Sequence, residues 1–411
     1  LDSDDVAALA LTKVGSGSAW QGYYMYHGGL QVIGERSSTQ ESHATGYPND
    51  VPVRDYDFFA PLGAAGAQRP HFHKLRQQHL MLDAFGSALA TSPATIPDQI
   101  EGGPRWSVRG DGERGFLFAN NHQPAIAALP RVDNVQFSVE FEQGAVTVPT
   151  HPISLESGAY FVWPLRQTYG GIPAVSVTAQ PVTQFTTPRG PVVLFAASEG
   201  IDVELQLEGV DPAEVSGATV RLDGDVVIAT PTVPPGLGCE VTVAGTTLVF
   251  LDRAAAESVW QGQIGGRDTT VLWNGGGWFE RDGFQAVLAD AEAVIDVFPP
   301  LTDASLNEVS GVGSIFTRYA TPASPAPVTL AVPAFTAKPL VPRRRGGSSN
   351  RLSAPTEDDF VGAASVEVTV PTAAFGDGQS ILTIDWTGDV IRAYIGEQLV
   401  ADQYWYGRTF E

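Results

Sequence analysis

The stretch that decides the fold reads GYYMYHGG at residues 22–29, TGYPNDVPVRDYDFFAPLG at residues 45–63 and RPHFHKLRQQHLML at residues 69–82. Its first part is an aromatic run, Tyr23 to Tyr26, that ends at paired glycines, a pattern typical of a strand breaking into a loop. Its last part begins at Pro70, which suits the first turn of a helix, and continues with apolar residues at helical spacing. We therefore expect a strand, a loop of about forty residues and a helix.

The long loop is the first candidate for a functional site. Loops of this length in compact domains are usually functional or disordered. Aromatic and histidine side chains lie in this loop or beside it, namely Trp20, Tyr47, Tyr56, His27, His43 and His71. This concentration of rings and imidazoles favours the functional interpretation.

The composition favours a β-rich chain with a neutral ligand. Among 411 residues, 44 are glycine and 30 are proline, so turns are frequent and many short strands are expected. A formal net charge of -22 argues against nucleic acid and against an anionic membrane surface as partners. The single cysteine, Cys239, cannot form an internal disulfide, and no Cys/His spacing indicates a metal site. We therefore expect no metal site.

Changes in amino-acid composition along the chain predict several regions. Proline- and glycine-rich stretches mark the candidate boundaries, and short alternating apolar runs after residue 90 predict β-sandwich architecture. In one run Val135, Phe137, Val139 and Phe141 face the same way. The predicted regions are a helix–strand–loop–helix segment at 1–90, a β-sandwich domain at 91–200, a second β domain with a short helix at 201–320, a linker at 321–353 and a last β region at 354–411.

Local signals place some elements within these regions. The first helix is expected from Asp2 to Val14, with Ser3 or Asp4 as its cap, and the short helix from Asp252 to Gly262. Alternating valines at 366, 368 and 370 indicate a strand, and two further strands are expected at 390–395 and 398–401.

The N-terminal stretch resembles the last strand, loop and helix of the catalytic barrel in family 35 glycoside hydrolases, the β-galactosidases. The resemblance is carried by YYMYHGG at residues 23–29, YDFFAPL at residues 56–62 and the Lys74-Leu75-Arg76 core of the helix. Two motifs in order, at plausible spacing and with the right helix after them, are fairly specific. The resemblance implies that residues 1–90 are the C-terminal end of a (β/α)8 barrel.

The resemblance continues into the β regions. GFLFANN at residues 115–121 and YFVWPL at residues 160–165 look like the β domain that follows the barrel in bacterial members. GDVIRAYIGEQLVADQYWYGR at residues 388–408 looks like the end of a jelly-roll, galactose-binding-like domain. The fold class expected is thus mainly β, with a barrel end followed by β-sandwich and jelly-roll domains, and both chain ends are expected to fall inside domains.

The activity implied by the resemblance is hydrolysis of terminal β-D-galactosyl bonds with retention and without a cofactor. Retaining glycosidases use two carboxylates roughly 5 Å apart, and in this family both come from barrel strands that precede the stretch. Neither Asn307-Glu308 nor Thr356-Glu357 lies near the quoted stretch in sequence, and Glu35 and Glu41 are better explained as solvated loop carboxylates. No catalytic residue is therefore expected here, and the chain alone is expected to be inactive.

The stretch can instead supply the wall of a sugar pocket. Sugars present C–H faces that stack on aromatic rings, while a few placed polar groups bind their hydroxyls. The substrate-binding candidates are Tyr24, His27, Tyr56 and Phe58. At the position of Phe58 many family members carry a tyrosine, so a hydroxyl is lost while the ring is kept. Core packing is the alternative for the run from Tyr23 to Tyr26.

The partners expected are a β-galactoside or oligosaccharide and, as a further alternative, a separate chain that carries the missing N-terminal barrel segment. A different class of function also stays open. The chain can be a non-catalytic carbohydrate-binding or scaffolding protein built from β-sandwiches, with Trp273, Trp278, Trp386 and Trp405 either on a binding surface or in the cores.

Overall fold

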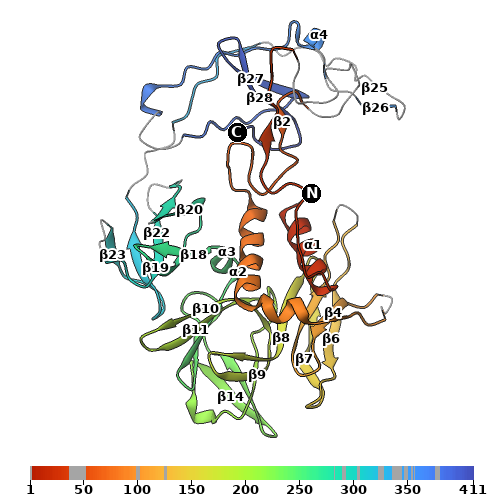
Figure 1. Ribbon diagram of the computed structural model, residues 1–411, viewed down its shortest axis with the longest axis vertical. Coiled ribbons are helices and arrows are strands. Elements are labelled where there is room, and N and C mark those ends of the chain that lie inside the picture. The colour runs from red at the N-terminus through yellow and green to blue at the C-terminus, as the bar shows by residue number, and fades with distance from the viewer. Residues whose placement is uncertain are drawn as a thin grey trace. The chain divides into compact units, whose positions relative to one another are not determined.

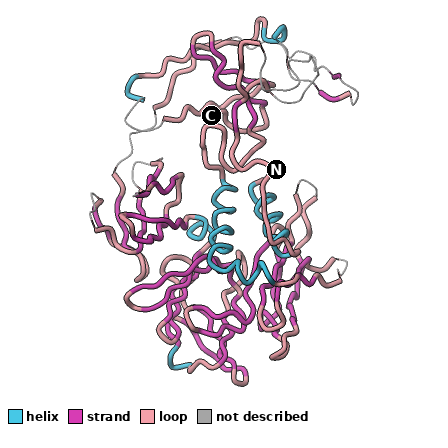
Figure 2. The backbone as a smooth tube through the Cα atoms, viewed as in Figure 1, coloured by secondary structure: helices cyan, strands magenta, loops and turns pink. Residues whose placement is uncertain are grey.

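The structure is a computed structural model, and the prediction that the chain is mainly β is confirmed (Figures 1 and 2). It folds into two compact units, each made of separated segments. Unit 1 comprises Leu1–Gly22 and Pro70–Ser324, and unit 2 comprises Tyr23–Arg69 and Pro325–Glu411. The residues described are 2–36, 52–98, 102–124, 127–281, 283–288, 293–302, 306–322, 328–335, 345–346, 350–352, 355, 357–374 and 380–411.

Unit 1 is built around two sheets packed face to face. The larger sheet has the spatial order β14 (Ala218–Asp223), β15 (Val226–Pro231), β12 (Leu205–Glu208), β9 (Ile172–Val177), β8 (Tyr160–Tyr169), β5 (Gly115–Asn120), β4 (Arg105–Gly110) and β3 (Ala94–Thr95). The smaller has the order β10 (Ala179–Thr187), β11 (Gly190–Ala197), β17 (Thr246–Leu251), β16 (Glu240–Val243) and β13 (Val215–Ser216). A short 3-10 helix at Pro212–Glu214 precedes β13.

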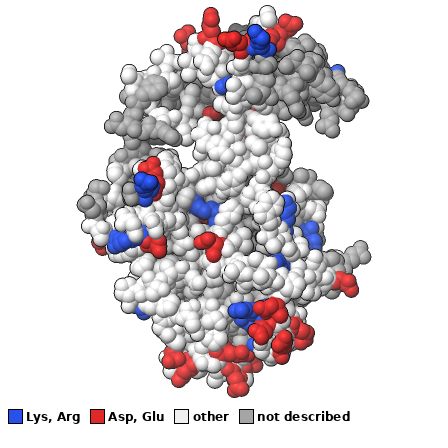
Figure 3. Space-filling view, viewed as in Figure 1, with Lys and Arg blue, Asp and Glu red and all other residues white. Residues whose placement is uncertain are grey.

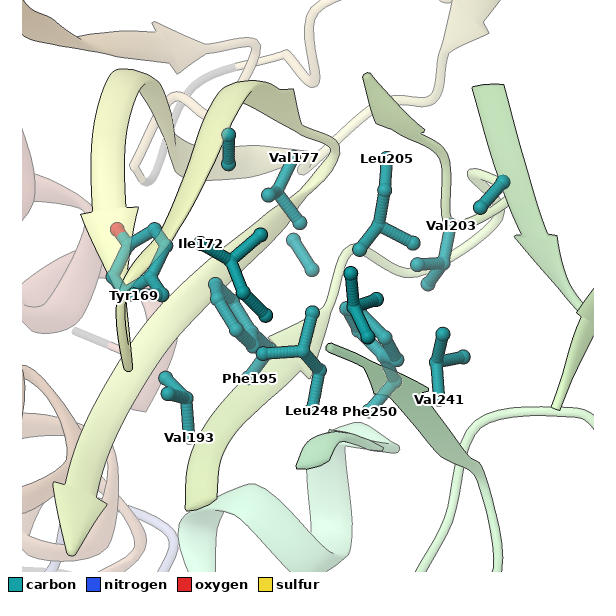
Figure 4. Packing of buried hydrophobic residues seen from close by; sticks show 14 of the residues in the cluster. Tyr169, Ile172, Val177, Val193, Phe195, Val203, Leu205, Val241, Leu248 and Phe250 are labelled. Carbon is teal, nitrogen blue, oxygen red and sulfur yellow. The ribbon is translucent and has the colours of Figure 1, made fainter. Parts of the chain in front are cut away.

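The core between the two sheets is apolar and fully enclosed (Figure 4). Val177 and Leu205 from the larger sheet meet Phe195 and Phe250 from the smaller one, and all four are shielded from solvent. The rings of Phe195 and Phe250 stack with their centroids 5.3 Å apart. Because buried apolar area is the main favourable contribution to folding, this cluster anchors the unit.

The hairpin of β6 (Val132–Val139) and β7 (Val146–Leu155) covers another part of the larger sheet. The prediction that four residues of this region share a face is confirmed, because Val135, Phe137 and Phe141 are buried in one cluster and Val139 packs against it. The cluster is completed by Trp163 of β8, whose ring stacks on Phe161 at 4.1 Å.

Two helices cover the opposite face of the larger sheet. They are α1 (Ser3–Gly15) and α2 (Pro70–Thr91), and Leu11 and Met81 pack on Phe116 and Phe118 of β5. Alternate β5 residues, Leu117 among them, belong to the core under the hairpin. Since side chains alternate along a strand, β5 is buried on both faces.

A third sheet of unit 1 has the spatial order β18 (Val259–Ile264), β19 (Arg267–Leu272), β22 (Val294–Phe298), β24 (Thr317–Ala320) and β23 (Asn307–Val309), with the hairpin of β20 (Gly277–Glu280) and β21 (Gly283–Ala286) beside it. Helix α2 contacts this sheet through Arg76. Its guanidinium lies 3.4 Å from the ring centroid of Trp260 and donates to the carbonyl of Val259.

Unit 2 is made of short elements: β1 (Gly29–Leu30), β2 (Asp55–Tyr56), β25 (Arg345–Gly346), β26 (Arg351–Leu352), α4 (Glu357–Phe360), a 3-10 helix (Thr372–Ala374), β27 (Val390–Ile395) and β28 (Gln398–Tyr404). Strand β1 pairs with β2 antiparallel, and β27 pairs with β28. The two strands predicted at 390–395 and 398–401 are therefore confirmed as a hairpin.

Several local predictions are wrong. The run from Tyr23 to Tyr26 is not a strand, because the rings of Tyr23 and Tyr26 pack together at 5.4 Å, whereas residues three apart in a strand point to opposite faces. The valines at 366, 368 and 370 also lie outside any strand. The cap of α1 is Asp2, which forms a capping box with Asp5.

The helix after Asp252 is shorter than predicted. Asp252 does cap it, but α3 (Arg253–Glu257) ends at Glu257 with Ser258 as its C-cap. The chain continues as β18, in which Val259 and Trp260 are buried in two different hydrophobic clusters. Strand β12, which follows residue 200, bonds to β9, which precedes it, so one sheet crosses that predicted boundary. Region 1–90 is shared between the two units.

Two surface properties bear on partners. On the face drawn in Figure 3, acidic side chains gather over the strands of unit 1 at the bottom of the view, in keeping with the net charge of -22. Within the described part of the chain, no helix has the length and apolar character needed to cross a membrane.

Candidate ligand site

A hollow of about 180 Å³ in unit 2 is the candidate ligand site. Four aromatic residues, two acids and a proline line it: Phe58, Phe59, Tyr404, Tyr406, Asp55, Asp57 and Pro52. By this measure a cavity of about 10–15 Å³ already holds one water, so the hollow is large enough for several waters. The hollow therefore has room for one small ring-shaped ligand.

Asp57 is the buried anchor of this site. Its carboxylate accepts two hydrogen bonds from the guanidinium of Arg69, at 2.6 and 3.0 Å, and one from the backbone N–H of Ala64. Gly28 lies against the same carboxylate, and a Cβ there would stand 2.6 Å from Oδ2 of Asp57. The HGG and YDFFAPL motifs therefore meet in space, and the glycine is required by the close approach.

Asp402 fastens β28 to β2. Its buried carboxylate accepts three backbone hydrogen bonds, from Val53 at 2.7 Å, Arg54 at 2.8 Å and Asp55 at 2.7 Å. This contact brings Tyr404 and Tyr406 to the hollow, because both follow Asp402 at alternate positions.

Asp55 differs electrostatically from these two carboxylates. It is half-buried, and among the described residues it forms no ion pair. Burial, followed by the negative charges of Asp57 and Asp402, raises the pKa of Asp55 to about 7. A backbone hydrogen bond from Asp57 and the charge of Arg69 oppose this rise only weakly. The hollow therefore presents one carboxyl that holds a proton near neutral pH.

The aromatic wall has an unusual backbone. Phe58 and Phe59 both adopt left-handed conformations, with φ of 49° and 57°, a strain of about 1–3 kcal/mol per residue that tends to occur at functional sites. The ring of Phe59 faces the guanidinium of Arg408 at 4.1 Å and that of Arg69 at 5.4 Å. Its neighbour Phe58 keeps its ring largely exposed.

The four predicted substrate-binding residues have different positions. Phe58 lines the hollow. Tyr24 and Tyr56 pack edge-to-face on the ring of Phe58, at 6.1 and 4.8 Å, and Tyr24 is 83% exposed, so its ring is not in a core. The Nδ1 of His27 hydrogen-bonds the carbonyl of Gly28, and its backbone bridges Leu62. His27 is not among the residues that line the hollow.

Other residues considered from the sequence lie elsewhere. His43, Tyr47 and Glu41 are outside the described residues, and Glu35 is exposed. Glu308 lies on β23 in unit 1, and Glu357 pairs with Arg392 in unit 2. Within the described ranges no group of three or more His, Cys, Asp or Glu side chains is arranged so that it could hold a metal ion. Trp273 is buried, whereas Trp278 and Trp405 are partly exposed.

The residues of the site that were not predicted from the sequence are Pro52, Asp55, Asp57, Phe59, Asp402, Tyr404 and Tyr406. A signal was present, because DQYWY places Asp402, Tyr404 and Tyr406 on one side of an extended chain. The acids of RDYDFF also alternate. No signal linked the two segments, since Arg54 and Asp402 are 348 positions apart.

Comparison of the chain with protein-family models and with curated proteins finds no match in either case.

Proposed function

We propose that this chain recognises the terminal β-D-galactosyl residue of an oligosaccharide in the hollow of unit 2. The observation that carries the proposal is the pair of left-handed phenylalanines, Phe58 and Phe59, held beside two acids. An aromatic face suits the C–H face of a sugar, and the acids suit its hydroxyls. In this proposal the left-handed backbone of Phe58 and Phe59 turns two adjacent rings toward one ligand.

The proposal extends to the parent activity implied by the sequence resemblance, a retaining β-galactosidase. In this view the segment at 1–90 is the end of a (β/α)8 barrel, and the segment at 354–411 belongs to a jelly-roll domain. Recognition, rather than bond cleavage, is assigned to these 411 residues. Asp57 is tied to Arg69 and Asp402 to three backbone donors, so neither is arranged as a free nucleophile.

A second candidate is a carbohydrate-binding protein that needs no catalytic partner. One observation favours it: the described residues that line the hollow all come from unit 2 of this chain. The two candidates share the ligand and differ in whether hydrolysis appears when upstream barrel sequence is added.

Binding of methyl β-D-galactopyranoside, measured by isothermal titration calorimetry, tests the recognition of a galactoside, which both candidate functions require. Replacing Phe58 by alanine is expected to raise Kd roughly tenfold, because an aromatic contact contributes about 0.5–1.5 kcal/mol beyond its area. Phe335→Ala is the matched control, since Phe335 is similarly exposed in the same unit and does not line the hollow. Equal losses in both variants, or no binding by the wild type, would contradict the proposal.

Hydrolysis of a chromogenic β-galactoside separates the two candidates. The 411-residue chain is expected to give no turnover, and the chain extended upstream to a full barrel is expected to be active if the parent is a galactosidase. Inactivity of the extended, folded chain that still binds galactoside would favour the second candidate. Turnover by the 411-residue chain would contradict the assignment of recognition alone.

A further inference from the structure

We propose that Asp55 meets the sugar as a neutral carboxyl that donates a hydrogen bond to one hydroxyl, so that binding weakens as the pH rises above neutrality. This inference rests on the proposed function, because it names the protonation state in which the same hollow works.

The geometry singles out Asp55 among three neighbouring acids. Both carboxylate oxygens of Asp57 accept hydrogen bonds, from Arg69 and from the backbone of Ala64. The carboxylate of Asp402 accepts hydrogen bonds from three backbone N–H groups. Both are buried, whereas Asp55 is half-buried and lines the hollow. Among the described residues, Asp55 is therefore the acid with both access to a ligand and a carboxyl that no cation pairs with.

Among the described residues, the cations near Asp55 compensate its charge only weakly. Arg69 is held by Asp57, and Arg54 donates to the carbonyls of Gln31 and Val400. The pairing strand β1 brings Leu30 opposite Asp55 and no charge. The titratable and charged groups that face this acid from the elements packed around it are Asp57, Asp402, Arg54, Arg69, Tyr404, Tyr406 and Arg408.

The electrostatics support the same protonation state. Burial and two like charges raise the pKa of Asp55 to about 7, and burial raises the pKa of Tyr406. Both groups can therefore donate a proton in a hydrogen bond at neutral pH. An ionised carboxylate can only accept, whereas a protonated one also donates.

The protonated form of Asp55 suits a neutral sugar. A protonated carboxyl donates a hydrogen bond to a sugar hydroxyl, and ionisation of Asp55 would remove this donor. The aromatic residues that line the hollow offer a face to the C–H side of the same ring.

The experiment is calorimetric titration of methyl β-D-galactopyranoside into the full chain from pH 5 to pH 9. The wild type is expected to show a constant Kd below about pH 6 and a rise that approaches tenfold per pH unit above about pH 7, as one-proton linkage requires. In Asp55→Asn the amide donates a hydrogen bond at every pH, so Kd should not change between pH 5 and pH 9. Asp225→Asn, at an exposed aspartate of unit 1, should follow the wild type.

The outcomes separate this inference from the proposed function. Binding with the same Kd from pH 5 to pH 9 would overturn the role of Asp55 and leave the sugar site standing. Absence of binding at every pH would overturn the proposed function and this inference together. A second measurement needs no variant: the carboxyl ¹³C resonances of the wild type should include one aspartate with a midpoint near pH 7, and midpoints all below pH 5 would overturn the inference.

Discussion

At the scale of single residues, the site depends on a glycine, because there is no room for a Cβ at position 28. Gly28 has no side chain, and the Asp57 carboxylate occupies the space where a Cβ would be. The same carboxylate pairs with Arg69, and the backbone of Asp57 accepts from Ala60 in the turn of the APL segment. One glycine therefore decides whether an ion pair and a turn can form together.

Replacing Gly28 by alanine should separate Asp57 from Arg69, because the new Cβ would stand 2.6 Å from Oδ2 and 2.9 Å from the backbone nitrogen of Ala64. We expect a loss of about 1–3 kcal/mol in the stability of unit 2, the range for a buried polar group left poorly paired. Hydrogen exchange of residues 52–69 in urea measures it. Gly29→Ala is the matched control, since a Cβ there meets nothing within 4 Å; equal effects in both would contradict the explanation.

Asp55 should make unit 2 less stable as the pH rises. Its pKa is about 7 when folded, against an ordinary value of 3.8, so the folded state holds the proton more tightly than the unfolded chain. The stabilisation is complete below about pH 4 and is lost as the pH rises through 7.

Asp55→Asn removes this dependence, because an amide has no proton to lose. We expect the free energy of unfolding of unit 2 to be higher in the variant than in the wild type by on the order of 2–4 kcal/mol at pH 8, and by little at pH 4. Each unit of pKa difference between the folded and unfolded states corresponds to about 1.36 kcal/mol. Urea unfolding followed by hydrogen exchange of residues 52–69 at both pH values gives the difference. A gain of the same size at pH 4 would point to packing instead of charge.

At the scale of elements, one arginine joins two helices to the larger sheet. Arg109 on β4 is 2% exposed and donates to the carbonyls of Val14, Leu89 and Ser92, which lie at the ends of α1 and α2. The carboxyl ends of helices carry partial negative charge, so a cation there is favourable. Burial lowers the pKa of Arg109, but a guanidinium stays charged.

Arg109→Met should lower the free energy of unfolding by roughly 3 kcal/mol or more. Several buried carbonyls lose their donor at once, and each unsatisfied group costs about 1–3 kcal/mol. Thermal unfolding followed by far-ultraviolet circular dichroism measures the change. Arg105→Met is the control on the same strand, since Arg105 is exposed and bonds only at the surface. A loss below 1 kcal/mol in Arg109→Met would show that water replaces the guanidinium.

The elements also show how far a sequence can be interpreted without its fold. Helix α2 and the hairpin of β27 and β28 follow from local signals, namely helical spacing after Pro70 and alternation before a turn. The aromatic run at 23–26 misled the prediction because composition, not alternation, suggested a strand. Phe58 could be proposed from its motif, whereas Asp402 could not, since its contact with Arg54 joins distant segments.

At the scale of the whole molecule, the two units are stabilised by different means. All five hydrophobic clusters formed by described residues lie in unit 1. Among those residues, unit 2 relies on polar ties, chiefly Asp402 to the backbone of β2 and Asp57 to Arg69. Because apolar burial dominates folding free energy, unit 2 should open before unit 1.

A chain that ends at Ser324 tests this division. It keeps every hydrophobic cluster of unit 1 but loses Asp402, Tyr404 and Tyr406, so the thermal transition of unit 1 should persist while galactoside binding disappears. Asp402→Asn in the full chain is the matched variant, because an amide nitrogen would face backbone donors that need an acceptor. It should weaken binding and leave unit 1 unchanged. Retained binding in the shortened chain would show that β28 does not build the site, and collapse of the unit 1 transition would show that the units do not fold separately.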